Sequence, residues 1–197
     1  MNKNLYLFDF DGTITKKDSY IDFFVSQFGK WYLFKKIVSN IFPIMKLSLQ
    51  KDKAELKKKL TFILLKDKSK TQLQEDAKNY FQNRRHLLIF NSAEKEITAI
   101  TKDPQNDVFI VSASLDLWLV YFAEYFKVKL ICTELDFQKD KYVGFKTKNC
   151  RGKEKVVRIQ KEVSLSDYDN IYAYGNSSGD KEMFELANEY FYKPFNK

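Results

Sequence analysis

Residues 4–14, NLYLFDFDGTI, form the stretch from which the fold of this chain can be predicted. The short apolar run ends in acidic residues and glycine, which is typical of a buried first strand that opens into a loop. Asp9 and Asp11 are two residues apart, so an extended backbone points both side chains to the same side. Two carboxylates held this close repel each other unless a divalent cation lies between them. Gly12 lets the chain turn with its backbone N–H groups facing an anion.

Buried apolar runs alternate with helical patterns in the second half of the chain. The expected strands cover residues 107–112, 130–133, 170–174 and 190–192, and the expected helices cover residues 91–100, 115–126, 153–163 and 180–187. A small hairpin is expected over residues 135–146, around Lys139 and Asp140. Such alternation predicts an α/β fold with a doubly wound parallel sheet. Ligands of these sheets bind beyond the carboxyl ends of the strands.

The stretch between the first two strands is different, because its apolar residues recur only at helical spacing. We expect an α/β core made of residues 1–14 and 88–197, with residues 15–87 inserted as an all-helical cap. Within the cap, helices are expected to begin at Ser19, to run from Trp31 to Pro43, to cover residues 56–64, and to follow a capping box of Ser69 and Gln72. A second capping box, of Asn91 and Glu94, is expected at the start of the first core helix.

Composition limits the partners of the chain. The 34 Lys and Arg residues exceed the 26 Asp and Glu residues and give a net charge of +8, which favours phosphorylated metabolites, anionic lipids or nucleic acid. No nucleic-acid recognition motif is present and the lysines are scattered, so nucleic acid is not expected as a partner. Cys132 and Cys150 are too few for a disulfide framework. With no leader pattern and no apolar run of about 18 residues, a cytoplasmic protein is expected.

Four motifs occur along the chain in a fixed order. They are DFDGT at residues 9–13, FIVSAS at residues 109–114, CRGKEKV at residues 150–156 and YGNSSGD at residues 174–180. Together they resemble the signatures of the haloacid dehalogenase-like (HAD) hydrolase superfamily, subfamily IB, in its phosphoserine-phosphatase-like branch. The resemblance covers the whole chain, because many members insert a helical cap where residues 15–87 lie.

The resemblance implies a Mg²⁺-dependent phosphomonoester hydrolase that works through an aspartyl-phosphate. Asp9 would be the nucleophile, Asp11 the general acid and base, and Lys155 the catalytic cation. The implied metal ligands are Asp9, the backbone carbonyl of Asp11, Asn176 and, through water, Asp180. The implied substrate-binding residues are Gly12, Thr13, Asp18, Ser112, Ala113 and Lys153.

Two of these roles have alternatives, and a third residue departs from the usual motif. Lys155 fits the helix opening of the branch, whereas Lys153 fits the spacing back from Asn176, so either could be the active-site lysine. Asp18 stands where phosphoserine phosphatases carry an acid that contacts the substrate's ammonium. The favoured alternative is that Asp18 or Ser19 caps the following helix. Asn176 replaces the usual Asp of the fourth motif and brings less charge to the metal.

The substrate also has alternatives. The leading expectation is a small phosphorylated metabolite in the cytoplasm. Residues 30–49, KWYLFKKIVSNIFPIMKLSL, are basic and aromatic and resemble the same region of bacterial phosphatidylglycerophosphatases. This segment favours a lipid-phosphate phosphatase with peripheral contact to the anionic inner membrane surface, unless its aromatic residues pack inside the cap. The third alternative is a non-catalytic protein that binds phosphoryl ligands, which only Asn176 favours. The sequence gives no indication of the oligomeric state.

Overall fold

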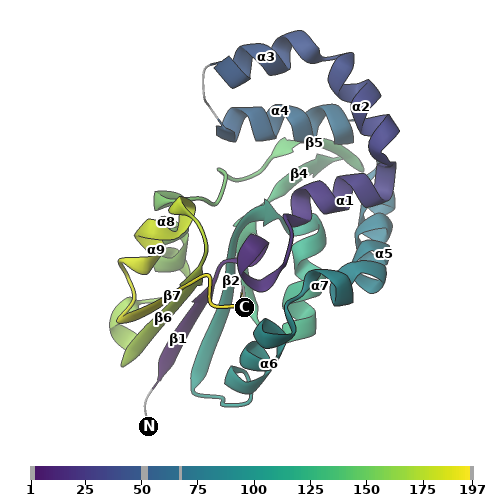
Figure 1. The fold of residues 1–197 in the computed structure, drawn as a ribbon. Coiled ribbons are helices and arrows are strands. Elements are labelled where there is room, and N and C mark those ends of the chain that lie inside the picture. The colour runs from purple at the N-terminus through teal and green to yellow at the C-terminus, as the bar shows by residue number, and fades with distance from the viewer. Residues whose placement is uncertain (1–2, 50–52, 67, 196–197) are drawn as a thin grey trace.

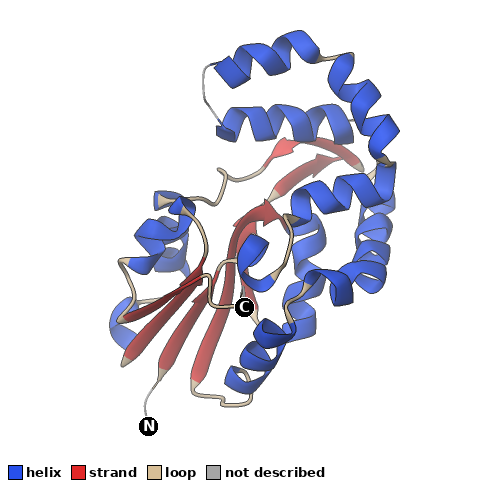
Figure 2. Cartoon of the chain, viewed as in Figure 1, coloured by secondary structure: helices blue, strands red, loops and turns tan. Residues whose placement is uncertain are grey.

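The core of the protein is a five-stranded parallel sheet (Figures 1 and 2). The computed structural model describes residues 3–49, 53–66 and 68–195. Along the sheet the order is β3-β2-β1-β6-β7, with bounds β1 Asn4–Phe8, β2 Asn106–Leu115, β3 Lys129–Thr133, β6 Asn170–Gly175 and β7 Glu189–Tyr192. The α/β fold with a parallel sheet is therefore confirmed, and β1 lies at its centre.

Alternation along β1 assigns its side chains to two separate cores. Leu5 and Leu7 face the side where Ile159 and Met183 pack, while Phe8 faces the larger cluster on the other side. Helices therefore cover both faces: α6 Asn91–Ile100 and α7 Asp116–Phe126 on one, and α8 Lys153–Glu162 and α9 Lys181–Phe184 on the other (Figure 1). The helix expected over residues 180–187 is shorter than predicted, because residues 178–180 form a separate tight turn.

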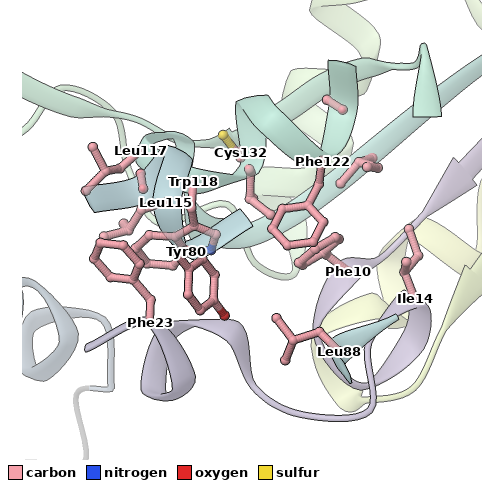
Figure 3. Packing of buried hydrophobic residues seen from close by; sticks show 14 of the residues in the cluster. Phe10, Ile14, Phe23, Tyr80, Leu88, Leu115, Leu117, Trp118, Phe122 and Cys132 are labelled. Carbon is pink, nitrogen blue, oxygen red and sulfur yellow. The ribbon is translucent and has the colours of Figure 1, made fainter. Parts of the chain in front are cut away.

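Five helices lie between β1 and α6. They are α1 Ser19–Phe28, α2 Lys30–Val38, α3 Ile41–Leu49, α4 Lys53–Leu65 and α5 Lys70–Leu88. Phe23 of α1 stacks on Trp118 of α7 with ring centroids 4.6 Å apart and meets Tyr80 of α5 edge-on at 5.2 Å (Figure 3). These rings are fully buried, so α1 and α5 are packed onto the α/β core.

The remaining helices α2, α3 and α4 extend over the hairpin formed by β4 Leu135–Gln138 and β5 Lys141–Phe145 (Figure 1). The expected hairpin is thus confirmed. The chain leaves and re-enters the core at one place, where Thr15 and Ile89 form an antiparallel bridge. This pairing lies beside the predicted boundaries of the cap at residues 15 and 87, which remain a prediction.

Pro43 does not end a helix, contrary to expectation. The helical run breaks earlier, at Ser39 and Asn40, and Pro43 is the third residue of α3. Proline is tolerated in a first turn because its missing N–H would have no partner within the helix. The side-chain amide of Asn40 donates to the Lys36 carbonyl at 2.9 Å, which gives the carbonyl at the end of α2 a partner.

The predicted caps behave differently from each other. The Ser69 hydroxyl accepts from the Gln72 N–H at 3.1 Å, so the Ser69 half of the predicted capping box is confirmed. The Gln72 side chain instead donates to the Asp76 carboxylate at 3.0 Å. The capping box of Asn91 and Glu94 is wrong, because Asn91 is already the first residue of α6. The Glu94 carboxylate accepts instead from the Tyr125 hydroxyl of α7.

Candidate active site

The first, second and fourth motifs meet at one edge of the sheet. Asp9 follows β1, Ser112 lies near the end of β2 and Asn176 follows β6, and these three strands are neighbours. A cavity of about 370 Å³ opens at this edge. Of the predicted site residues, those that line it are Asp9, Asp11, Asp18, Ser112, Ala113, Lys155, Asn176 and Asp180.

Lys155 lies at the centre of the site. Its ammonium donates to the Asp9 Oδ1, the Asp180 Oδ1 and the Val111 carbonyl, each at 2.7 Å, and only 2% of the residue is exposed. All three N–H bonds of the ammonium therefore have acceptors. Lys155 shares a helix face with the buried Ile159, four residues later, whereas Lys153 is exposed at the start of α8.

Burial and the neighbouring carboxylates shift the pKa of Lys155 in opposite directions. Burial alone would lower the pKa of Lys155, but the Asp9 and Asp180 carboxylates outweigh it and raise the pKa to about 12. Burial raises the pKa of Asp9 to about 6, although Lys155 opposes this shift. At neutral pH the lysine is therefore charged and Asp9 remains a carboxylate, which is the form needed for nucleophilic attack.

Asp11 is held by two serines. Its Oδ1 accepts from the Ser19 N–H at 2.6 Å, and its Oδ2 accepts from the Ser114 hydroxyl. Burial, followed by the nearby charge of Asp18, raises the pKa of Asp11, while the two serine donors oppose the rise. A raised carboxyl pKa suits a group that must carry a proton in one step and release it in another. Ser114 was not predicted, although strand alternation from Ser112 could have identified it.

Gly12 and Thr13 support the site without lining the cavity. Gly12 has φ +74°, and a Cβ atom there would lie 2.1 Å from the side-chain amide of Asn176. Only glycine therefore allows both the turn and this close approach. The buried Thr13 hydroxyl donates to the Asp9 Oδ2 at 3.1 Å, so it orients the carboxylate.

The fourth motif closes on itself through Asp180. The Asp180 Oδ2 accepts from the Asn176 N–H at 3.2 Å and from both the backbone N–H and the hydroxyl of Ser177 at 3.0 Å. Since Oδ1 accepts from Lys155, both oxygens of Asp180 already have donors. Burial alone would raise the pKa of Asp180, but Lys155 and these donors outweigh burial and lower it. Asp180 therefore stays charged.

The oxygen donors of this edge suit Mg²⁺. Within the described residues, no group of three or more His, Cys, Asp or Glu side chains is placed to hold a metal. The residues with oxygen donors that line the cavity include Asp9, Asp11, Asn176 and Asp180. Mg²⁺ is commonly bound by one or two carboxylates together with waters and substrate phosphate, so this sparse set fits it.

Of the two roles that the sequence left open for Asp18, the structure shows the helix cap. Its carboxylate accepts from the Ile21 N–H at 3.1 Å and so caps α1, which confirms the capping role. The same residue also lines the cavity.

Lys57 is a further cavity residue that was not predicted. It comes from α4, and its ammonium donates to the Ala113 carbonyl at 2.7 Å. Burial lowers the pKa of Lys57, although Asp11 and Asp18 oppose the shift. Lys57 is one of three successive lysines, residues 57–59, and nothing in that run distinguishes the one that points inward. Through Lys57, the inserted helices contact the end of β2, where Ser112 and Ala113 lie.

Comparisons with known proteins identify relatives of this chain in sequence and in fold. A family model described as haloacid dehalogenase-like hydrolase matches residues 6–185. The chain is 31% identical to the protein CicA of Caulobacter vibrioides over 195 residues, which covers 97% of this chain and 86% of that protein.

Two solved structures share the fold. One is a protein of unknown function from Bordetella pertussis Tohama I, with a TM-score of 0.81, 18% identity and coverage of 98% of this chain and 90% of that one. The other is a phosphoserine phosphatase with an analogue of its phospho-aspartyl intermediate, with a TM-score of 0.61, 19% identity and coverage of 98% and 87%. The phosphoserine-phosphatase-like fold is therefore as the sequence predicts. Because the family match spans most of its length, this chain belongs to the haloacid dehalogenase-like hydrolase family.

Proposed function

We propose that this protein is a Mg²⁺-dependent phosphomonoesterase that hydrolyses a small phosphorylated metabolite in the cytoplasm through an aspartyl-phosphate. The observation that carries the proposal is the contact of the buried Lys155 ammonium with both Asp9 and Asp180, in a cavity that Ser112 also lines. A cation fixed beside a carboxylate nucleophile is what transfer of a phosphoryl dianion requires.

In the first step, an Asp9 oxygen attacks phosphorus while the bond from phosphorus to the leaving oxygen breaks. Asp11, protonated, gives its proton to that oxygen. In the second step, water attacks the phosphorus of the aspartyl-phosphate, Asp11 takes its proton, and the bond between Asp9 and phosphorus breaks to release phosphate. The Ser112 hydroxyl and the Ala113 N–H would hold the phosphoryl oxygens, and Lys155 would balance the negative charge.

The metal would be held by Asp9, the Asp11 carbonyl and Asn176, with Asp180 acting through water. When bound, Mg²⁺ supplies positive charge to the phosphoryl oxygens. Asn176 offers a neutral oxygen where a carboxylate would bind more tightly, so we expect Asn176→Asp to lower the Mg²⁺ concentration needed for half-maximal activity. An unchanged magnesium dependence would remove Asn176 from the ligand set.

The direct test is hydrolysis of an aryl phosphate with Mg²⁺, by the whole chain and by its Asp9→Asn variant. We expect turnover by the chain and none by the variant, because the amide is not a nucleophile for phosphorus. Circular dichroism confirms that the variant is folded. No turnover by the folded parent chain, over a broad panel of phosphate esters, would favour the non-catalytic binding protein instead.

A lipid phosphate is the second candidate substrate, favoured by the exposed aromatic side chains of α2 and α3. The two substrate classes can be separated by comparing kcat/KM for soluble phosphate esters with that for a phosphorylated lipid in mixed micelles. Preference for the soluble esters supports the leading proposal, and preference for the lipid replaces it.

A further inference from the structure

The outer side of the α2–α3 segment exposes an unusual concentration of large apolar side chains. Phe42 is 84% exposed, Leu49 80% and Trp31 67%. We call the full set the α2–α3 face: Trp31, Phe34, Ile37, Val38, Ile41, Phe42, Met45 and Leu49, each exposed by 37% or more. Apolar side chains that are exposed singly are normal, but eight large ones on two consecutive helices indicate a binding surface.

On α2, this face is not the packing side of the helix. Tyr32 and Leu33 of α2 turn toward the large core cluster, and no described residue of α2 is buried. Trp31 and Phe34 lie on the opposite side and stack on each other with ring centroids 5.5 Å apart. In Figure 1, α2 and α3 form the outermost part of the protein, beyond α4. The face is therefore open to a partner.

Charge indicates the kind of partner. Residues 30–49 contain four lysines, at positions 30, 35, 36 and 46, and no acidic residue. Protein interfaces are depleted of lysine at their apolar cores. Membrane interfaces, in contrast, accommodate Trp, Phe and Leu below the headgroups while lysines reach the anionic phosphates. The Lys35 ammonium lies 5.4 Å from the Trp31 ring centroid, so aromatic and basic groups share this surface.

We propose that the α2–α3 face docks onto an anionic lipid bilayer. Within the described residues, no helix is long and apolar enough to cross a membrane, so the contact is peripheral. Helix α4 lies behind the face, and its residues Lys53 and Lys57 line the active-site cavity. Docking would therefore hold the cavity one helix layer away from the bilayer surface. The proposal concerns location and does not require phosphatase activity.

Sedimentation with vesicles tests the binding itself. We expect the full chain to bind vesicles of phosphatidylcholine with phosphatidylglycerol, to bind phosphatidylcholine alone poorly, and to release at high salt. The double variant Phe34→Ser, Phe42→Ser should lose binding by about tenfold or more, because both rings leave the bilayer. The control is Val157→Ser with Tyr192→Ser, which removes two exposed apolar side chains from α8 and β7 and should bind normally.

The two tryptophans provide a spectroscopic readout. Trp31 is exposed on the face, whereas Trp118 is fully buried in the core. Anionic vesicles should shift the emission of Trp31 to the blue, and Trp31→Phe should remove the shift. Both the parent chain and the Phe34→Ser, Phe42→Ser variant should hydrolyse a soluble aryl phosphate equally, so a failure of docking is separable from a failure of the proposed function.

Three outcomes would overturn the proposal. The first is no binding to anionic vesicles, and the second is binding that survives the Phe34→Ser, Phe42→Ser variant. The third is a dimer in lipid-free ultracentrifugation that this variant dissociates, which would assign the face to a second copy of the chain.

Discussion

Lys155 and Lys153 differ by two positions, but only one of them reaches the acids of the site. Lys155 is buried between Asp9 and Asp180, and replacing it leaves two buried carboxylates without their cation. We expect Lys155→Met to lower kcat on an aryl phosphate by about a hundredfold or more, since a fixed charge near the phosphoryl group is lost.

Lys153→Met provides the matched control for this prediction. Its side chain is exposed at the start of the same helix, so we expect kcat within about twofold of the parent chain. Comparable losses in both folded variants would show that the buried contact of Lys155 is not what the reaction uses.

Asp116 gives a test of pH dependence away from the site. Burial, reinforced by Glu134 and opposed by the Leu135 N–H, raises its pKa from 3.8 to about 6. The folded chain therefore holds this proton more tightly than the unfolded chain, and the free energy of unfolding falls as pH rises from 3.8 to about 6. Asp116→Asn cannot ionise and should be more stable than the parent at pH 7, by about 3 kcal/mol, and this difference should vanish at pH values well below 3.8.

The measurement is chemical denaturation of both proteins at several pH values. Asp107→Asn is a control of opposite sign. Burial alone would raise the pKa of Asp107, but hydrogen bonds from Lys129 and Tyr168 outweigh burial and lower it. That variant should be less stable than the parent at pH 7, and the gap should close as pH falls. A pH-independent gap for Asp116→Asn would refute the ionisation argument.

Among the elements, the β4–β5 hairpin contains a polar atom without a partner. The Tyr142 hydroxyl is buried and is the one buried side-chain polar atom without a hydrogen bond in the described part of the chain. Its ring packs against Phe62 and Phe137. Because an unpaired buried hydroxyl costs about 1 kcal/mol or more, Tyr142→Phe should stabilise the fold and raise Tm by about 2–4 °C.

Tyr20→Phe is the matched comparison, measured by the same thermal unfolding. The Tyr20 hydroxyl is paired with the Thr61 hydroxyl at 2.9 Å, so its removal should lower Tm. If Tyr142→Phe also lowers Tm, its hydroxyl has a partner such as an ordered water.

The elements themselves were predictable where a pattern is local. The apolar runs of β1, β2 and β6 and their acidic or serine-containing ends required no knowledge of tertiary contacts. The break between α2 and α3 could not be predicted, because Pro43 is compatible with either ending a helix or lying in its first turn. The choice of Lys155 over Lys153 depends on where α8 begins. The helix starts at Lys153, directly after Gly152 with φ +60°, and this start fixes the face that each lysine occupies.

Residues whose role depends on long-range contacts could not be predicted from the sequence, for a different reason. Lys57 is identical in type to its neighbours in the run 57–59, and only the packing of α4 over β5 selects it. The same holds for the α2–α3 face, whose aromatic spacing fits both a packed cap and an exposed surface. In such cases the alternatives differ only in what the other elements cover.

At the scale of the whole molecule, backbone hydrogen bonds are among the contacts that attach the inserted helices to the rest of the chain, and they occur at two separate places. One is the chain crossing, where the Lys16 N–H donates to the Leu88 carbonyl at 2.7 Å. The other is the hairpin turn, where the Lys70 N–H donates to the Asp140 carbonyl at 2.9 Å and the Asp140 carboxylate accepts from both the N–H and the hydroxyl of Thr71. The second attachment fixes the start of α5 against the core.

Asp140→Ala should loosen the second attachment while leaving the crossing intact. Two hydrogen bonds to Thr71 are lost, which is worth about 1–2 kcal/mol in total. We expect faster amide hydrogen exchange in the first turn of α5 and in α4, with unchanged exchange in β1 and β2, because opening there is local. Asp136→Ala, on the same hairpin, is the control and should leave α5 unchanged. Uniformly faster exchange across the sheet would instead mean that hairpin, inserted helices and core unfold as one cooperative unit.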